Sequence, residues 1–497
     1  MAATAAPLET ADLSRLDTLR VWAKHLTSLY LPALGLAFVL TGPHPWWVAI
    51  LFILPLVWAH HVDCSARVER RQPSRSVPAW PFDALVYVLA ALQLATVAGL
   101  VVMFASGQGV FSMDMAMTFV IVGASSGFSI ITAHELIHRP RKAEQVLGRL
   151  LLSSVLYEHF YTEHLRGHHV RVGTAEDPAT ARFGESYERF FRRTVPAQLR
   201  SAWRLETTRL GDPDMALLDR RQLGNRVLHG LVFEWGVAAA IWAGFGLPAF
   251  VAFLLQAHVA VRLLEAVNYF EHWGLVRRGT RVAPVDSWDT HGWFTYYGLV
   301  GLSRHADHHA YPIRPYQKLR VWDEAPLLPY GYVGAIDHVL ADNDEFMRIA
   351  TEELGRRRLG PFTPEGDAAE APSLPVEQVH AALAEARAVE DSQRDLGLDP
   401  FGWLRRLAQA LSSHAARALV VAVGLLATTA AVQWETGGVQ MAFGARLLLH
   451  TWVAVALAAT VFVGVQLHQR TAHESFAWTV AMALLVLLGW ASTAVAG

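Results

Sequence analysis

The stretch "DMAMTFVIVGASSGFSIITAHELIH", residues 114–138, combines a long apolar run with two histidines. Residues 114–133 are predominantly apolar and have about the length, roughly 20 residues, that a helix needs to cross a bilayer. His134 and His138 follow without a break, and residues at i and i+4 lie on the same face of a helix. The stretch therefore predicts a membrane-spanning helix with two imidazoles at one end.

The whole chain has the composition of a membrane protein. Of its 497 residues, 53% are hydrophobic and only 17% are charged, whereas soluble proteins usually carry about 25% charged residues. The net charge of -2 gives no sign of a nucleic-acid partner. The single cysteine, Cys64, excludes an internal disulfide framework and metal knuckles built from cysteine pairs. Neither a dinucleotide-binding nor a phosphate-binding glycine motif occurs, so the sequence indicates no flavin, nicotinamide or nucleotide module.

Apolar segments of spanning length occur in two blocks. We predict six spans in the first block and three apolar helices in the second. The six are 27–42, 45–60, 83–106, 114–133, 228–247 and 249–270, and the three are 417–433, 444–467 and 475–496. Residues 146–161, interrupted by Arg149 and Glu158, are expected to form a buried or interfacial helix, and 293–302 is too short to cross. The predicted fold is therefore an all-α integral membrane protein, a six-helix transmembrane bundle with a C-terminal extension.

Basic residues predict the orientation of the spans. The segment after the second span holds Arg67, Arg70, Arg71 and Arg75, and the segment between the fourth and fifth spans is also rich in arginine. The connections at 42–45, 106–114 and 244–248 contain neither lysine nor arginine. The positive-inside rule then places the N terminus, residues 134–227 and residues 272–415 in the cytoplasm.

Composition also predicts four parts of the chain. They are a cytoplasmic N-terminal segment (1–24), the six-span core (25–350), a polar cytoplasmic linker (351–415) and the C-terminal membrane extension (416–497). Residues 1–20 lack the pattern of a cleaved signal peptide, so the first span is expected to direct insertion. The linker is rich in Pro, Ala and acids, with one polar helix expected near 375–391.

Nine histidines cluster at the predicted cytoplasmic ends of the spans. "YTEHLRGHHVRV" (161–172) repeats the i, i+4 spacing and adds an adjacent ring, "NYFEHWGL" (268–275) supplies one, and "SRHADHHAYP" (303–312) supplies three. The candidate metal ligands are His134, His138, His164, His168, His169, His272, His305, His308 and His309. Nitrogen ligands without thiolates suit iron, copper or zinc. Nine rings exceed the needs of one ion, and they divide into two irons with four or five ligands each.

Acidic residues stand close to these histidines in the sequence. Ligand histidines normally donate their second ring N–H to an acceptor such as a carboxylate. We expect this role for Glu135, Glu163, Glu271, Asp307 and Asp177. Glu158 and Glu265 are further candidates, although Glu158 could equally face solvent or an arginine. For Glu265, inside an apolar span, Arg262 one turn earlier is a candidate partner.

The four histidine-bearing segments resemble the signatures of a known family. "HELIHR", "EHLRGHHVRVGTAEDPATAR", "NYFEHWGL" and "LSRHADHHAYPIRPYQKL" are similar to those of the membrane-bound alkane 1-monooxygenases, within the membrane fatty acid desaturase–hydroxylase superfamily. The resemblance covers about residues 25–340, and "NYFEHWGL" distinguishes it from ordinary desaturases. It implies a non-haem di-iron centre held by the nine histidines on the cytoplasmic side of a bacterial inner membrane. It also implies hydroxylation of the terminal methyl group of medium- or long-chain n-alkanes with dioxygen.

Some positions depart from the family pattern. Trp273 stands where tyrosine is common, Ser303 and Ala306 where glutamine and serine are common, and His291–Gly292 where an Asn-His pair is frequent. An alkyl-aromatic methyl hydroxylase acting on xylene or cymene, or a fatty acid desaturase or lipid hydroxylase, therefore stays an alternative. A metal transporter is disfavoured, because its ligands would line a path near the middle of the membrane.

The resemblance also implies partners. Two electrons per turnover must come from outside a chain that carries no redox module of its own. We therefore expect a separate rubredoxin or ferredoxin with its NAD(P)H reductase, docking on the arginine-rich segments 139–142 or 189–204. The other expected partners are O2, membrane lipid and a hydrophobic small molecule. A substrate tunnel within the bundle could be capped by bulky residues, namely Trp46, Trp47, Phe52 and Trp58.

Overall fold

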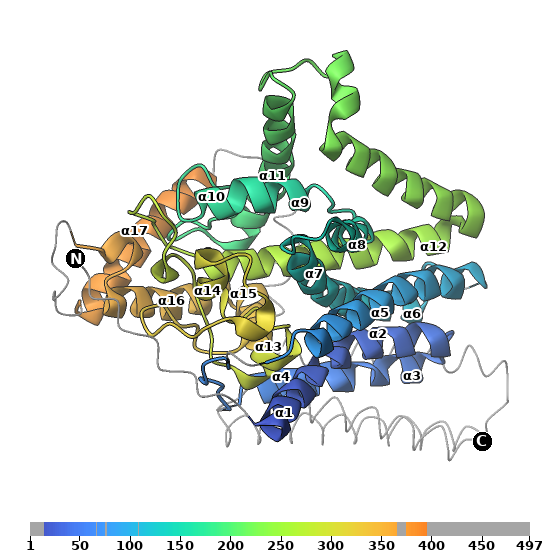
Figure 1. Cartoon of the computed structure of the whole chain (residues 1–497), viewed down its shortest axis with the longest axis horizontal. Coiled ribbons are helices and arrows are strands. Elements are labelled where there is room, and N and C mark those ends of the chain that lie inside the picture. The colour runs from blue at the N-terminus through green and yellow to red at the C-terminus, as the bar shows by residue number, and fades with distance from the viewer. Residues whose placement is uncertain (1–13, 66, 75–76, 108, 365–373, 395–497) are drawn as a thin grey trace, which may run out of the picture. The chain divides into compact units, whose positions relative to one another are not determined.

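The computed structural model describes residues 14–65, 67–74, 77–107, 109–364 and 374–394. Within these ranges the chain is helical, and its extended contacts amount to two isolated bridges, Val68 with Gly292 and Asp289 with Leu327 (Figure 1). The predicted all-α class is therefore confirmed. The three C-terminal apolar segments, predicted at 417–433, 444–467 and 475–496, lie outside the described residues.

The described residues contain five helical segments long and apolar enough to cross a membrane. They are Leu16–Thr41, Trp46–Asp63, Trp80–Ala105, Met113–Ile137 and Arg226–His272. The last segment, α12 (Arg226–His272), unites the predicted fifth and sixth spans. At Gly246 its backbone adopts φ 84° and ψ 176°, a region that glycine enters at little cost, and Pro248 follows. Figure 1 shows α12 as two arms that meet at a sharp bend. All six predicted spans are thus present, and the protein is a multi-pass membrane protein.

Three of the first four spans differ from regular single helices. Several short elements follow one another in the first, second and fourth spans, whereas the third span is one continuous helix. In chain order they are α1 (Arg15–His25), η1 (Leu26–Leu29), α2 (Tyr30–Thr41), α3 (Trp46–Leu51), α4 (Ile53–Asp63), α5 (Trp80–Ala105), α6 (Met113–Met117), η2 (Thr118–Val122) and α7 (Gly123–Ile137). The first span starts earlier than the predicted residue 27, because the backbone stays in the right-handed helical region through Leu26 and Tyr30.

The remaining helices are short or amphipathic. They are α8 (Lys142–Ser153), α9 (Phe160–Glu163), η3 (His164–His168), α10 (His169–Arg171), α11 (Tyr187–Arg209), η4 (Arg220–Gly224), η5 (Pro284–Asp286), α13 (Trp293–Gly298), α14 (His305–Ala310), η6 (Tyr316–Lys318), α15 (Tyr332–Ala341), α16 (Asn343–Arg357), η7 (Gly360–Phe362) and α17 (Val376–Arg394). The helix predicted over 146–161 is confirmed in part: α8 buries Leu151 and Leu152 while Arg149 stays partly exposed, but the helix ends at Ser153. Residues 293–302 contain the short and largely buried helix α13, as expected of a segment too short to cross.

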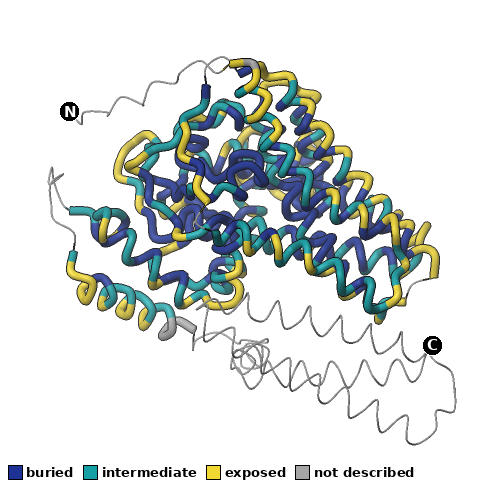
Figure 2. Tube along the Cα trace, turned by 90° about the horizontal axis from the view of Figure 1, so that it is seen from below, coloured by how far each residue is buried: buried dark blue, intermediate teal, exposed yellow. Residues whose placement is uncertain are grey.

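Helices α7 and α12 pack closely through glycine. A Cβ atom at Gly123 would lie 2.6 Å from Val259, and one at Gly127 would lie 2.8 Å from Leu263. Small residues of this kind let membrane helices approach closely. The close packing brings the C-terminal end of α7, with His134 and His138, beside the C-terminal end of α12, with His272. Figure 2 shows the buried residues concentrated inside the described part, with exposed residues along the outer faces of the long helices.

The predicted polar helix near 375–391 is observed as α17. Its Val379 packs against Gly355 of α16, and Glu390 accepts hydrogen bonds from the Ser186 backbone N–H (3.0 Å) and hydroxyl (2.9 Å). Glu390 thereby binds backbone at the start of α11. Helix α16 itself continues across residue 350, where the sequence placed the end of the core.

Candidate metal centre

All nine predicted histidines come together, in two groups. The five-histidine group consists of His134, His138, His164, His169 and His308, and the four-histidine group consists of His168, His272, His305 and His309. Within each group, one ring nitrogen from every residue lies within 4.8 Å of those of the others. All nine side chains are buried or half-buried.

Local helix geometry decides which histidine joins which group. The i, i+4 spacing brings His134 and His138 together on α7, as predicted, and also places His305 and His309 of α14 in one group. The same spacing does not place His164 and His168 of the second box in one group, because η3 is a π-helical turn. A π turn aligns residues five apart, so His164 shares its group with His169, while His168 joins the other group.

The ring nitrogens are placed as ligands of a shared ion would be. Nε2 of His164 lies 3.0 Å from those of His138 and His169, which are 3.2 Å apart. Each Nε2 atom can either donate or accept, so three mutually contacting atoms cannot all be satisfied by one another. Ligands at right angles around an ion, each at about 2.1 Å, would lie roughly 3 Å apart. The donor set therefore fits a metal ion.

Other buried nitrogens support the same conclusion. Within the described part of the chain, Nε2 of His134, Nε2 of His168 and both ring nitrogens of His309 have no hydrogen-bond partner. Leaving a buried polar atom unpaired costs about 1–3 kcal/mol. Metal ions bound through one nitrogen each of His134, His168 and His309 would satisfy three of these atoms, so the groups fit a metal site.

Burial keeps these rings in the form that binds metal. Desolvation is the main cause that holds the pKa of six of the histidines well below the ordinary value of 6.5. These are His138, His164, His169, His305, His308 and His309. A neutral imidazole offers the lone pair that a metal ligand needs.

Two of the five predicted acids contact candidate ligands. Asp177 Oδ2 lies 2.9 Å from Nδ1 of His168 and also accepts the Thr180 hydroxyl at 2.6 Å. This contact leaves Nε2 of His168 to face its group. Glu271 lies in a different position: its Oε2 is 3.2 Å from Nε2 of His305, the atom that faces His272, while Tyr332 donates its hydroxyl to Oε1 at 2.7 Å. Glu271 thus lies in front of the rings, where a ligand would be.

The other three predicted acids bind arginine instead. Glu135 pairs with Arg139 (3.2 Å), Glu163 with Arg171 (2.6 Å) and Asp307 with Arg314. Burial raises the pKa of Glu163 to about 7. Consecutive residues on a helix do not face each other, so an acid next to a ligand in the sequence points away from its ring.

The further acids also have partners of their own. Glu158 pairs with Arg149 at 2.5 Å, one of the alternatives expected from the sequence. Arg262 binds Glu188 rather than Glu265, so that predicted pair is wrong. Glu265 instead accepts the Tyr157 hydroxyl at 2.7 Å and the Gln198 amide at 2.9 Å.

The sequence reasoning missed Asp289. This buried carboxylate accepts the backbone N–H of Ala306 at 2.7 Å, in the first turn of α14. Burial raises the pKa of Asp289 to about 8. The contact fixes the helix that carries three candidate ligands. A helix cap normally precedes its helix directly. The sequence therefore did not identify Asp289, 17 positions before Ala306, as the acceptor for this helix.

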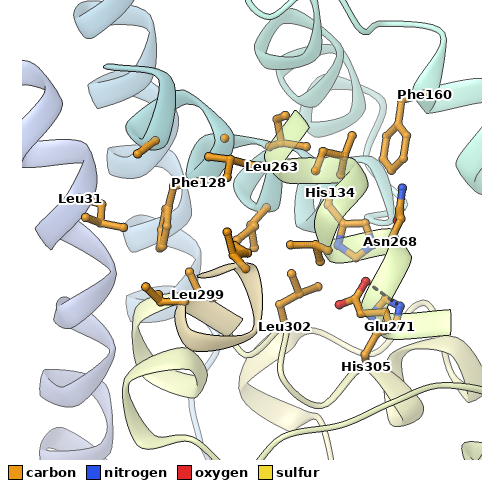
Figure 3. Close-up of a pocket in the computed structure, with 18 of the residues that line it drawn as sticks. Leu31, Phe128, His134, Phe160, Leu263, Asn268, Glu271, Leu299, Leu302 and His305 are labelled. Atoms are coloured by element: carbon orange, nitrogen blue, oxygen red, sulfur yellow. Dashed lines mark ion pairs between the residues drawn. The ribbon is translucent and has the colours of Figure 1, made fainter. Parts of the chain in front are cut away.

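A cavity of about 220 Å³ adjoins both histidine groups. His134 and His164 of the five-histidine group and His305 of the four-histidine group line it, together with Glu271 and Asn268. In Figure 3 the labelled polar residues lie on one side of the cavity, and Leu31, Phe128 and Leu299 lie on the other. The rest of the lining is apolar, including Leu56, Ala59, Leu263, Leu302 and Ile336.

None of the four predicted tunnel residues, Trp46, Trp47, Phe52 and Trp58, lines this cavity. Trp58 is 50% exposed and packs at a tilt against Tyr30 with ring centroids 5.1 Å apart, and Phe52 packs edge-on against Phe38 at 5.2 Å. Leu56 and Ala59, on the same helix as Trp58, reach the cavity instead. The size of a residue did not reveal which helix face it occupies.

Known proteins resemble the part of the chain that holds this site. Residues 112–335 match the fatty acid desaturase family. Alkane 1-monooxygenase 1 of Pseudomonas aeruginosa is 40% identical over 213 residues, which are 42% of this chain and 55% of that protein. Alkane 1-monooxygenase of Acinetobacter baylyi is 39% identical over 233 residues (45% and 55%), and alkane 1-monooxygenase 2 of Alcanivorax borkumensis is 39% identical over 234 residues (45% and 59%).

The chain thus spans a little over half the length of these curated relatives. All nine histidines fall inside the matched residues 112–335. The similarity predicted from the four motifs is confirmed: the region that carries the histidines matches the fatty acid desaturase family model, and the chain is similar to curated alkane 1-monooxygenases.

Proposed function

We propose that this protein is a membrane-bound non-haem di-iron monooxygenase that hydroxylates the terminal methyl group of medium- or long-chain n-alkanes with dioxygen. Its electrons would come from a separate rubredoxin or ferredoxin, and its site would face the cytoplasm from a bacterial inner membrane. One observation carries the proposal: two groups of buried histidines adjoin one apolar cavity.

The residues present suit iron. The five-histidine and four-histidine groups would each hold one ion, and Glu271 Oε2 would add an oxygen ligand to the four-histidine group. Five nitrogen donors exceed the four ligands of a typical structural zinc site, whereas octahedral iron accommodates them. Bound iron would supply the oxidation of a C–H bond by dioxygen, which acid–base side chains do not perform.

The cavity lining suits a saturated hydrocarbon. Its wall away from the histidines offers only apolar contacts, so a substrate binds there through burial of its methylene groups, each worth about 0.8 kcal/mol. Phe160 lies against the His164 ring with centroids 4.7 Å apart and helps to exclude water at that end. An alkane with one end toward the histidines would present its terminal carbon to both groups, because both groups line the cavity.

Polar residues around the site hold the ligands in place. Asp177 keeps the Nδ1 proton of His168 and so directs Nε2 toward the four-histidine group. The Tyr332 hydroxyl fixes Glu271 through Oε1 and leaves Oε2 facing His305. Asn268, at the same end of the cavity, donates its side-chain amide to Glu265 at 3.2 Å. These bonds restrict the rings and the carboxylate to one geometry.

Product analysis tests the proposal. The full chain, in membranes or lipid nanodiscs, is given n-octane, n-dodecane, n-hexadecane or p-xylene with rubredoxin and its reductase. We expect 1-alkanols from the n-alkanes and two iron ions per chain by metal analysis. Alkenes would indicate a desaturase, and oxidation of p-xylene alone would indicate an alkyl-aromatic hydroxylase. No terminal alcohol across the panel, with iron bound, would refute the proposal.

A further inference from the structure

A buried aspartate joins three helices near the cavity. Asp63, the last residue of α4, is 2% exposed. Its Oδ1 accepts the hydroxyl of Thr295 at 2.6 Å and the backbone N–H of the same residue, on α13, at 3.1 Å. Its Oδ2 accepts the backbone N–H groups of Val333 (2.8 Å) and Gly334 (3.3 Å), both on α15. The second span is thus tied to α13 and α15, which lie beside it (Figure 1).

These hydrogen bonds complete the N-terminus of α15. The first N–H groups of a helix have no partner within the helix, and the side chain of the residue before it usually caps them. Helix α15 starts after Gly331, which has no side chain to offer. A Cβ atom at this position would overlap the Asp63 carboxylate. Asp63 and Thr295 therefore supply the cap from two other helices, and the Thr295 hydroxyl accepts the Tyr332 N–H at 2.7 Å.

The capped turn carries Tyr332, whose hydroxyl reaches the four-histidine group. This hydroxyl donates to Glu271 Oε1 at 2.7 Å, and it also lies 3.2 Å from the Leu302 carbonyl oxygen. Glu271 Oε2 lies 3.2 Å from Nε2 of His305, and Figure 3 shows the two side chains pointing toward each other. A continuous set of hydrogen bonds therefore leads from the end of the second span to Glu271. Its four members are buried: Asp63, Thr295, Tyr332 and Glu271.

Helices α4 and α15 also line the cavity. Leu56 and Ala59 of α4 and Val333 and Ile336 of α15 belong to its lining. A residue that fixes α15 against α4 therefore holds both the apolar wall of the cavity and the carboxylate that faces His305.

We propose that Asp63 is a positioning residue for the four-histidine group, because it fixes the place of the Glu271 carboxylate. It acts through the Thr295 hydroxyl and through the backbone and ring of Tyr332. The inference rests on the proposed function, in which Glu271 Oε2 adds an oxygen ligand to that group. Removing a residue that orients a metal ligand typically costs 10–100-fold in metal affinity. The effect of losing this connection should therefore appear at one metal position and not at both.

Substitutions along the connection test it in the full chain, held in lipid nanodiscs and titrated with iron(II). Thr295→Val removes the hydroxyl but keeps the shape of the side chain and Asp63 itself. We expect it to weaken one of the two iron positions about tenfold and to change one of the two Mössbauer signals of the bound iron. Asp63→Asn and Tyr332→Phe should change the same signal. Thr295→Ser keeps a hydroxyl and should restore the wild-type affinity and spectrum.

Asp114→Asn is the matched control. Asp114 is a buried acid at the end of the fourth span opposite to His134, where it accepts the His44 backbone N–H at 2.9 Å. This variant should keep the wild-type iron affinity and spectrum, even where it unfolds at a lower temperature.

Two outcomes overturn the assignment of Asp63. A lower unfolding temperature of Thr295→Val with unchanged iron affinity and spectrum would show that the connection only stabilises the fold. Equal changes in both Mössbauer signals would show a general loosening of the site. Failure of the proposed function is distinct from these results. A wild-type protein that binds two irons but forms no alcohol would refute that function alone, and one that binds no iron would refute both.

Discussion

The five-histidine group and the four-histidine group use the same side chain, but their carboxylate contacts differ. In the described residues, Asp177 holds His168 and Glu271 faces His305, and both histidines belong to the four-histidine group. The candidate acids next to the five-histidine group, Glu135 and Glu163, bind arginines instead. Carboxylates stabilise positive charge close to them. Two metal positions built from one ligand type would therefore differ electrostatically.

The largest expected effect comes from removing one ligand from each group. His308→Ala and His309→Ala change neighbouring residues that belong to different groups. Each variant should lose one iron and at least about 100-fold in alcohol formation, because removing an outer-shell partner alone costs 10–100-fold. Metal analysis and Mössbauer spectra of the remaining iron should show two different sites.

His159→Ala is the matched control for these variants. This histidine is buried, its two ring nitrogens lack partners within the described part, and it lies in neither group. The variant should keep both irons. Wild-type activity in His308→Ala or His309→Ala would remove that residue from the ligand set.

The second effect concerns Asp177, the carboxylate that contacts His168 of the four-histidine group. Asp177→Asn removes the charged acceptor at His168 Nδ1 and should lower iron affinity at that position by about 10–100-fold. Asp307→Asn is the control, because Asp307 binds Arg314 and the Trp322 indole rather than a histidine. Iron titration followed by absorption measures both. A greater loss of iron in Asp307→Asn than in Asp177→Asn would contradict the conclusion that the carboxylate contact of Asp177 supports the four-histidine group.

The third effect reaches both groups through α14. Asp289→Ala removes the acceptor for the Ala306 N–H and should cost about 1–2 kcal/mol of stability. Asp289→Asn keeps an oxygen acceptor and should cost less. Denaturant unfolding in detergent, with iron bound, measures the difference. Equal destabilisation in the two variants would show that the hydrogen bond to the Ala306 N–H does not account for the cost.

The smallest effect lies outside both groups and provides a baseline. Burial alone would raise the pKa of Glu69, but hydrogen bonds from Arg71 and Tyr297 outweigh it and lower the pKa from 4.5 to about 2. Because the folded pKa is the lower one, this stabilisation is present above pH 4.5 and is lost as the pH falls from about 4.5 toward 2.

Glu69→Gln should remove this pH dependence without changing iron content. The expected loss at neutral pH is on the order of 1 kcal/mol, because Arg71 is largely exposed to solvent. Thermal unfolding of both proteins between pH 3 and 7 measures it. A loss of iron from either group in Glu69→Gln would show that Glu69 also supports metal binding.

Hydropathy and histidine spacing predicted most of the architecture and all nine members of the two groups. Six apolar segments of spanning length are present as helices, because the need to bury backbone polar groups in lipid leaves few alternatives. The histidines could be selected because imidazole is uncommon at the ends of apolar helices. Neither argument depends on exact side-chain direction.

Side-chain direction is what the sequence did not reveal. Glu135 and Asp307 neighbour candidate ligands in the sequence but point away from them, whereas Asp177, nine residues after His168, reaches its ring. Trp58 was chosen for its size, yet its helix turns Ala59 toward the cavity. Asp289 caps a helix from another segment, a long-range contact without a local pattern.

The π turn at His164–His168 has a consequence for the spacing of the two groups. His168 and His169 are joined by one peptide bond but belong to different groups, and the same holds for His308 and His309 on α14. The backbone at each of these two pairs therefore limits the distance between the two metal positions. The separation of two bound ions would be set covalently at two places, and it would persist while electrons enter and leave the pair.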